Sequence, residues 1–251
     1  MNDSTTRFSN RVADYVKYRP GYPFEIVSWL QQHYHLSQEK IIADIGSGTG
    51  ISTSLFLKAG NTTLGVEPNK EMRDMSVKLL AGYPHFRAIN GRAEATTLDN
   101  NSVDVIVCGQ AFHWFDMTKA KQEFRRILRK DGILVLIWNE RLTDSGFEKE
   151  YDKLLIKYGT DYTRVDHRNT GPDAISSFFS PLHFELITFP NKQVFDFDGL
   201  RGRLLSSSYV PAVNEMGHES MLKTLRELFD RYNQNDQIAV TYVTKVYAGA
   251  F

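Results

Sequence analysis

Three glycines at alternate positions, preceded by an acid, are the first residues of this sequence that could do chemistry. Residues 41–52 read IIADIGSGTGIS, so Asp44 is followed by Gly46, Gly48 and Gly50. When a strand turns into a helix through such a loop, bare backbone and helix N-terminal amides face a ligand. The spacing therefore predicts a cofactor site where the first strand ends.

The residues beside these glycines separate three classes of ligand. A Walker loop needs a Lys-Ser/Thr pair after its last glycine, but Ile51 and Ser52 stand there. The dinucleotide fingerprint needs a small residue at position 51, and Asp44 would repel a pyrophosphate. S-adenosylmethionine carries an ammonium and a sulfonium and no phosphate, so it fits these observations. We predict this cofactor, with S-adenosylhomocysteine as its product and no metal.

Two further acids could extend the cofactor site. Glu67 follows the second predicted strand, where a carboxylate can accept both ribose hydroxyls. The alternative is a solvated acid at the end of a strand. Glu94 closes the sequence GRAE after the third strand, where it could meet an adenine edge or remain a surface acid.

Alternating strands and helices must position these residues. Strands are predicted at residues 40–45, 62–66, 86–89, 103–107 and 133–138, from short apolar or β-branched runs. Helices are predicted at residues 24–34, at 52–59 and after the N-cap Asn69, and a basic helix striped by Phe124 and Ile127 is expected to end at Asp131-Gly132. This alternation indicates βαβ crossovers and a parallel sheet.

The second half of the chain follows a different pattern. It predicts helices at residues 147–158, 197–205 and 214–232, a sixth strand at 184–194, a polar loop up to Pro172, and a last strand that alternates from Ile238 to Val246. We expect a single domain over residues 1–251. Its parts are an N-terminal helical cap (1–36), a cofactor-binding core (40–140), a segment of helices, sixth strand and helical substrate cap (141–235), and the last strand (236–251).

Five segments resemble class I S-adenosylmethionine-dependent methyltransferases: DIGSGTG, GVEP, GRAE, SVDVIVCGQAFHWFD and LRKDGILVLIW. They come in the family's order, and LRKDG stands where Leu-Lys-Pro-Gly is commoner. The resemblance implies an α/β fold with a doubly wound, seven-stranded, mostly parallel sheet whose last strand is antiparallel. YVKYRPGYP near the start and AFHWFD after the fourth strand are similar to the trans-aconitate methyltransferase-like group of small-molecule enzymes.

Carried onto matching positions, the resemblance implies a set of cofactor contacts. Along the methionine moiety these are Asp44, Gly46, Ser47, Gly48 and Gly50; at the ribose, Glu67 with Pro68 beneath it; at the adenine, Ala93 and Glu94; and near the sulfonium, Gln110. Tyr15 and Arg19 could hold the methionine carboxylate, or only tie down the N-terminal helix.

The aromatic segment after the fourth strand could serve the methyl transfer itself. His113 is the candidate catalytic base, with a packed wall residue as the alternative, and Trp114 and Phe115 would shape the pocket. A carboxylate nucleophile needs no base, whereas an alcohol or a protonated amine does. Candidates for acceptor recognition, chosen only because they lie in the predicted cap, are Arg141, Arg203, Ser207 and Tyr209.

Composition narrows the possible partners. Lys+Arg and Asp+Glu both total 30, and this zero net charge disfavours nucleic acid and anionic lipid. The sequence Cys108-Gly109-Gln110-Ala111 lacks the Asn/Asp-Pro-Pro-aromatic segment of enzymes that methylate nucleobase amino groups, and Val107 rather than Pro precedes Cys108. No stretch approaches a membrane-spanning length. We expect a cytoplasmic protein with a small-molecule partner.

These observations predict transfer of a methyl group from S-adenosylmethionine to a small-molecule acceptor. O-methylation is favoured over N-methylation, with a carboxylate as the favoured acceptor. Two alternatives stay open at this point: a nicotinamide-dependent oxidoreductase, which Ile51 and Asp44 disfavour, and a non-catalytic module that binds the cofactor.

Overall fold

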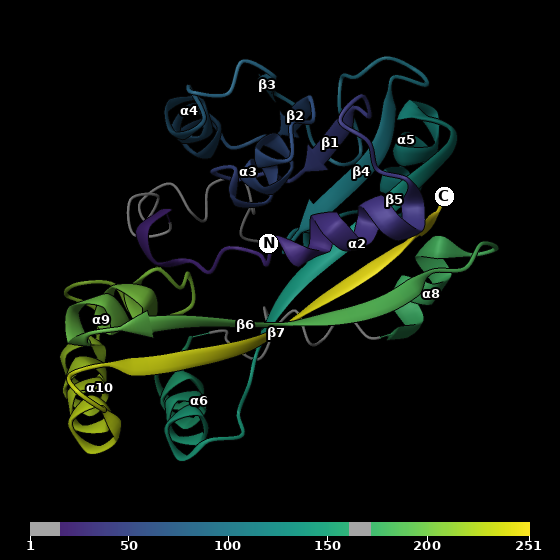
Figure 1. Ribbon diagram of the computed structural model, residues 1–251. Coiled ribbons are helices and arrows are strands. Elements are labelled where there is room, and N and C mark those ends of the chain that lie inside the picture. Colours follow the sequence, from purple (N-terminus) through teal and green to yellow (C-terminus); the bar gives the residue numbers. More distant parts are fainter. Residues whose placement is uncertain (1–15, 161–171) are drawn as a thin grey trace.

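The computed structural model describes residues 16–160 and 172–251. A seven-stranded sheet with strand order β3-β2-β1-β4-β5-β7-β6 forms its centre (Figure 1). The strands are β1 (Ile42–Ile45), β2 (Thr63–Val66), β3 (Phe86–Ile89), β4 (Val103–Gly109), β5 (Leu128–Arg141), β6 (Glu185–Phe195) and β7 (Ile238–Ala250). Strands β1 to β5 pair in parallel, and β7 is antiparallel to both of its neighbours. The predicted fold class is confirmed.

Helices bury both faces of the core of this sheet. Every residue of β1 is buried, as is typical of a parallel strand that is covered on both sides. On one face α2 (Glu25–Tyr34) and α3 (Ile51–Lys58) contribute Leu30 and Phe56; on the other, α5 (Met117–Ile127) and α8 (Pro172–Phe179) contribute Phe124 and Phe179. Helix α4 (Lys70–Leu79) follows β2 and contacts β3. The carboxyl ends of β1, β2 and β4 are thereby held in fixed positions.

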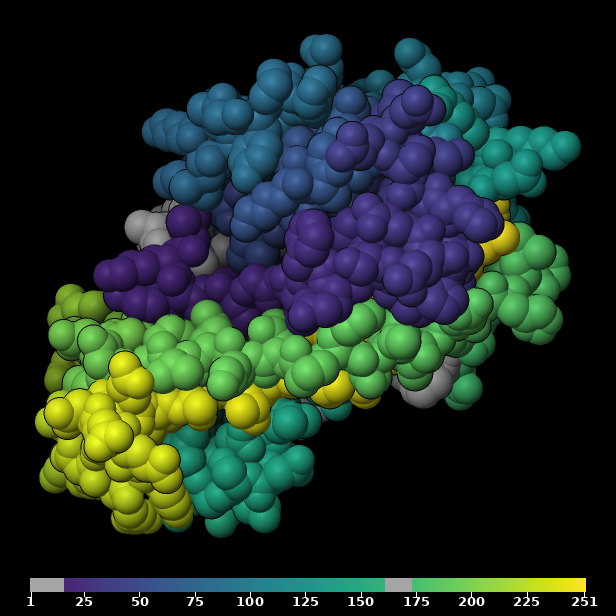
Figure 2. Space-filling model, in the orientation of Figure 1, coloured from purple at the N-terminus to yellow at the C-terminus, as the bar shows by residue number. Residues whose placement is uncertain are grey.

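A second group of helices packs on the long ends of β5, β6 and β7. We call α6 (Gly146–Tyr158), α9 (Phe197–Leu205) and α10 (His218–Tyr232) the cap; their apolar faces meet Ile238, Val240 and Tyr242 of β7. Figure 1 shows the cap at one end of β6 and β7 and α8 at the other. In Figure 2 the N-terminal residues, in purple, lie between the blue core and the green segment that contains α9.

Two elements differ from the predictions. Helix α5 ends at Ile127 and not at Asp131, because Leu128 adopts an extended backbone and pairs with Val103, so β5 begins there. Helix α8 was not among the predicted elements, because its sequence, PDAISSFF, is too short for a clear helical period. The burial of Phe178 and Phe179 results from tertiary contacts, which a local pattern does not show. No helix of the described ranges is long and apolar enough to cross a membrane.

Candidate active site

The turn between β1 and α3 presents bare backbone. Gly46 and Gly48 have φ angles of 71° and 56°, in the left-handed region that glycine tolerates. A Cβ atom on Gly46 would lie 2.6 Å from Cβ of Ala111, so glycine lets the segment after β4 approach; around Gly48 the space is open. The N–H groups of Gly46 and Ser47 donate to the carbonyl oxygen of Val66 at 2.9 and 3.2 Å. These bonds fix the turn against β2.

Asp44 is fully buried at the end of β1. Its Oδ2 accepts hydrogen bonds from Ser52 Oγ at 2.7 Å and from Thr53 Oγ1 at 2.6 Å. Its Oδ1 has no hydrogen-bond partner within the described residues. Burial raises the pKa of Asp44 to about 6, against the effect of the two hydroxyls. A buried carboxylate with one unsatisfied oxygen fits a ligand that carries a positive charge or donates a hydrogen bond.

Glu67 follows β2 and is oriented by backbone groups on both sides. Oε2 accepts from Gly48 N at 2.9 Å, and Oε1 accepts from Asn69 N at 2.8 Å. Burial raises the pKa of this carboxyl group, while the two N–H groups and Arg73 lower it. Each oxygen can accept a further hydrogen bond. The carboxylate is therefore preorganised to receive two hydroxyl donors, as the ribose assignment requires.

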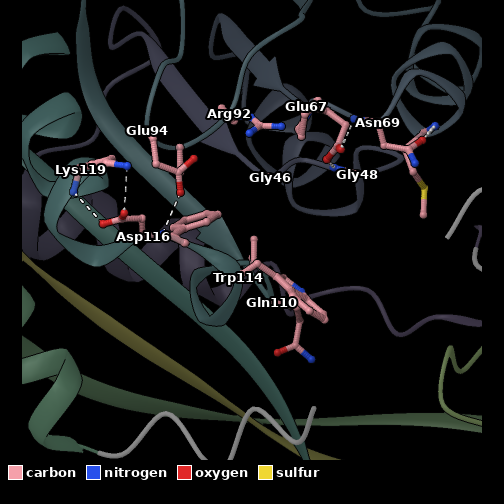
Figure 3. A pocket seen from close by; sticks show the side chains of 16 residues that line it. Gly46, Gly48, Glu67, Asn69, Arg92, Glu94, Gln110, Trp114, Asp116 and Lys119 are labelled. Carbon is pink, nitrogen blue, oxygen red and sulfur yellow. Dashed lines mark hydrogen bonds and ion pairs between the residues drawn. The ribbon is translucent and has the colours of Figure 1, made fainter. Parts of the chain in front are cut away.

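A cavity of about 450 Å³ joins the turn, Glu67 and the segments after β3 and β4. Its lining consists of Gly46, Gly48, Glu67, Pro68, Asn69, Met72, Arg92, Ala93, Glu94, Gly109, Gln110, Ala111, Trp114, Phe115, Asp116 and Lys119. Figure 3 shows Glu67 and Asn69 in one part of it, Glu94 and Asp116 in another, and Gln110 with Trp114 in a third. A site of this size and mixed polarity suits a nucleoside-sized ligand.

The part of the cavity around Glu94 is built on the start of α5. Asp116 is the N-cap of α5, and its backbone N–H donates to Glu94 Oε1 at 2.8 Å. Asp116 also lies 3.5 Å from Lys119 Nζ. Next to them Ala93 is buried at the wall. Polar and apolar groups therefore lie together in this part of the cavity, where an adenine could contact the polar groups with its edge and the apolar groups with its ring.

Gln110 stands just past β4 in a strained backbone conformation. Its φ angle is 55°, which is uncommon for a residue with a side chain and typical of functional sites. Its backbone N–H donates to Ile137 O at 2.9 Å, and Nε2 donates to Asn139 O at 3.4 Å. Oε1 is buried with no partner in the part of the chain that the structure describes. Its amide oxygen can therefore accept from a ligand.

Several predicted site residues do not line this cavity, and the fully buried Asp44 is one of them. Ser47 and Gly50 belong to the turn but are not part of the cavity wall. A Cβ atom on Gly50 would lie 2.6 Å from Leu80 Cδ1. Arg19 Nη2 donates to Ser206 O at 3.1 Å, which ties the N-terminal segment to the end of α9. His113 lies in the short helix η2 (Phe112–Trp114), with its ring 4.8 Å from that of Trp114. Tyr15 falls outside the described residues.

The cavity also has wall residues that the sequence motifs did not indicate: Asn69, Met72, Asp116 and Lys119. The signal for Asn69 was present, because an N-cap residue two positions after Glu67 must start its helix beside that carboxylate. Asp116 has the same character, as an N-cap directly after the aromatic segment. An N-cap residue can therefore line a ligand site as well as begin a helix.

Comparison with known proteins agrees with this geometry. Residues 43–136 match the model of a family described as "Methyltransferase domain". An uncharacterized methyltransferase from Mycobacterium bovis is 34% identical over 175 residues, which are 70% of this chain and 68% of the relative. An uncharacterized methyltransferase from Schizosaccharomyces pombe is 28% identical over 247 residues, 96% of this chain and 95% of the relative.

A solved structure shows the same fold over nearly the whole chain. A protein from Anaeromyxobacter dehalogenans, assigned as a type II methyltransferase, superposes with a TM-score of 0.70 at 21% identity. The match covers 93% of this chain and 98% of that one. With the glycine turn, its two acids and the family match in agreement, this chain belongs to the class I S-adenosylmethionine-dependent methyltransferases.

Proposed function

We propose that this methyltransferase acts on an oxygen atom of a small-molecule acceptor, with a carboxylate as the favoured nucleophile. The observation that carries the proposal is that one cavity has the bare turn, Glu67 and Gln110 in its wall. The turn and Glu67 can hold a nucleoside, and Gln110 and Trp114 occupy a separate part of the same cavity (Figure 3).

The cofactor roles follow from the contacts of each residue. We assign the methionine part to the backbone of Gly46 and Gly48 and to Asp44 Oδ1, which has no other partner among the described residues. The ribose hydroxyls go to the two oxygens of Glu67. Ala93 and Glu94 take the adenine, as the resemblance implies.

The reaction depends mainly on the alignment of the acceptor with the methyl group that is transferred. When bound, S-adenosylmethionine supplies an electrophilic methyl group, and this chain must orient the acceptor in line with it and exclude water. Such positioning can supply on the order of 7–11 kcal/mol. The described residues that line the cavity include no histidine. A carboxylate nucleophile, which has no proton to lose, suits such a wall.

His113 remains our candidate base for an acceptor that must lose a proton. With an alcohol acceptor, His113→Ala should lower kcat by about 10²–10⁴-fold and leave cofactor affinity unchanged, because the ring lies outside the cofactor wall. With a carboxylate acceptor the same variant should keep its kcat. A change confined to acceptor binding would identify His113 as a wall residue.

The test of the proposed function is formation of S-adenosylhomocysteine with a panel of small acids, alcohols and amines. We expect turnover with at least one acid and a methyl ester as its product by mass spectrometry. Turnover of amines alone would contradict the O-directed reaction. Tight cofactor binding without turnover across the panel would instead support a non-catalytic binding module.

The resemblance of YVKYRPGYP and AFHWFD to the trans-aconitate methyltransferase-like group supports a small acid as acceptor. The cytoplasmic location and the absence of a nucleic-acid partner remain predictions from sequence.

A further inference from the structure

The cap contains a buried arginine that has no acidic partner among residues 16–160 and 172–251. Arg203, on α9, is only 8% exposed. Its Nε donates to Tyr242 Oη at 3.2 Å and its Nη1 donates to Ser207 Oγ at 3.4 Å. Across the described residues it forms no ion pair with a carboxylate, and its strongest interactions with titratable groups are with three tyrosines, Tyr242, Tyr151 and Tyr209.

These hydroxyl partners do not neutralise the guanidinium. Burial raises the pKa of Tyr151 to about 12, so its phenol is uncharged at neutral pH. Tyr242 Oη already donates to Gln193 Oε1 at 3.0 Å. An arginine is charged at every physiological pH, and a buried charge without a counter-ion costs stability. A cost of this kind is typical of residues kept for function.

Two acids of α6, which belongs to the same cap, are engaged elsewhere. Asp152 forms an ion pair with Arg141, whose guanidinium also lies 5.1 Å from the ring centroid of Tyr151. Glu148 accepts hydrogen bonds from Thr241 and from the backbone N–H groups of Asp144 and Ser145. Within the described residues the charge of Arg203 therefore has no counter-ion.

Two hydrogen bonds and the paired strands β5 and β7 connect the cofactor cavity with Arg203. Gln110, on the cavity wall, donates to the carbonyl of Asn139 in β5. Two residues further along β5, Arg141 pairs in register with Tyr242 of β7, whose hydroxyl accepts from Arg203.

The N-terminal segment joins the same two regions. A Cβ atom on Gly109 of the cavity wall would lie 2.9 Å from Tyr22 Oη. Three residues earlier in the chain, Arg19 is bonded to Ser206 at the end of α9. Residues 19–22 therefore connect the end of β4 with the end of α9, and three Cα–Cα steps span at most about 11 Å.

We propose that Arg203 binds an anionic group of the acceptor, a carboxylate or a phosphate, while another part of the acceptor reaches the cavity at Gln110. The inference rests on the proposed function. Only two of the five guanidinium N–H donors have partners among the described residues, so a planar pair of oxygens can be bound in a bidentate way. Tyr242 Oη and Ser207 Oγ accept hydrogen bonds from Nε and Nη1 and thereby fix the orientation of the guanidinium.

The test uses thermal unfolding of the protein saturated with S-adenosylhomocysteine. Sodium malonate and sodium phosphate are each compared with sodium chloride at equal ionic strength, so the two arms separate the two anion classes. We expect a rise in Tm of about 2–5 °C with one of them. Arg203→Gln should abolish the rise in Tm. Arg203→Lys keeps the charge but loses the planar guanidinium that binds two oxygens at once, so it should reduce the rise.

The matched control is Arg201→Gln, an exposed arginine on the same helix, which should behave as the wild type. An equal rise in Arg203→Gln and wild type, or no rise in wild type, would overturn the inference. Calorimetric titration with S-adenosylhomocysteine separates the two proposals. If the wild type and Arg203→Gln bind S-adenosylhomocysteine equally and no anion effect is seen, only the proposed anion site is wrong. If the wild type does not bind S-adenosylhomocysteine, the proposed function fails.

Discussion

Glu67 is the residue on which cofactor affinity should depend most. Its carboxylate is held by Gly48 N and Asn69 N on the cavity wall. Glu67→Ala should weaken S-adenosylmethionine binding by about 1.5–3 kcal/mol, the range for hydrogen bonds to a charged group, or roughly 10- to 150-fold in Kd. Isothermal titration calorimetry measures this. Glu39→Gln, an exposed acid, is the control. Unchanged affinity in Glu67→Ala would refute the ribose assignment.

Asp44 should make the ligand-free protein less stable as the pH rises. Its pKa is raised from 3.8 to about 6, so between these values the folded state binds more protons than the unfolded state. The free energy of unfolding therefore falls from about pH 4 to pH 6, by on the order of 3 kcal/mol, and is level above that range.

The substitution Asp44→Asn removes the charge and tests this account. It should flatten the pH dependence and raise stability at pH 7.5, while it weakens S-adenosylmethionine binding. Urea unfolding at several pH values measures the first effect and calorimetry the second. Asp173→Asn, at an exposed site, is the control. A loss of stability in Asp44→Asn at pH 7.5 would contradict the account.

At the scale of elements, substitution of two of the three glycines in the β1–α3 turn, Gly46 and Gly48, should have different effects. Gly46→Ala adds a Cβ atom 2.6 Å from Ala111 in a left-handed conformation, so both overpacking and backbone strain should lower stability, by about 2–5 kcal/mol. Gly48→Ala meets open space and carries only the strain, about 1–2 kcal/mol, but places a methyl group toward the cavity. Thermal unfolding with and without S-adenosylhomocysteine separates them. Equal loss of stability in both would contradict this.

The elements that the sequence predicted well are those with local signals. The apolar run before Asp44 and the N-cap Asn69 lie where expected. The end of α5 was missed because the pairing of Leu128 with Val103 is a long-range contact that overrides helical periodicity. The same limit applies to the site: the motif places Ser47 and Gly50 in the turn, but which side faces the ligand depends on the packing of Leu80 and Ala111.

At the scale of the whole molecule, we propose that cofactor and acceptor are bound by different parts of the chain. The cofactor wall comes from residues 46–119, whereas Arg203 and Tyr242 belong to the cap and the last strand. Sequence could place Arg203 in the cap but could not show its burial or its lack of an acidic partner, because both arise from contacts between distant segments. The family match covers residues 43–136 and does not include the cap, so it leaves the acceptor open.

The central claim is that the cavity beside Gly48 and Glu67 is built for S-adenosylmethionine. Calorimetric titration of the full chain with S-adenosylmethionine, and separately with NADH, tests it most directly. The account predicts one site per chain for S-adenosylmethionine and no heat of binding for NADH. Binding of NADH with no binding of S-adenosylmethionine would contradict it.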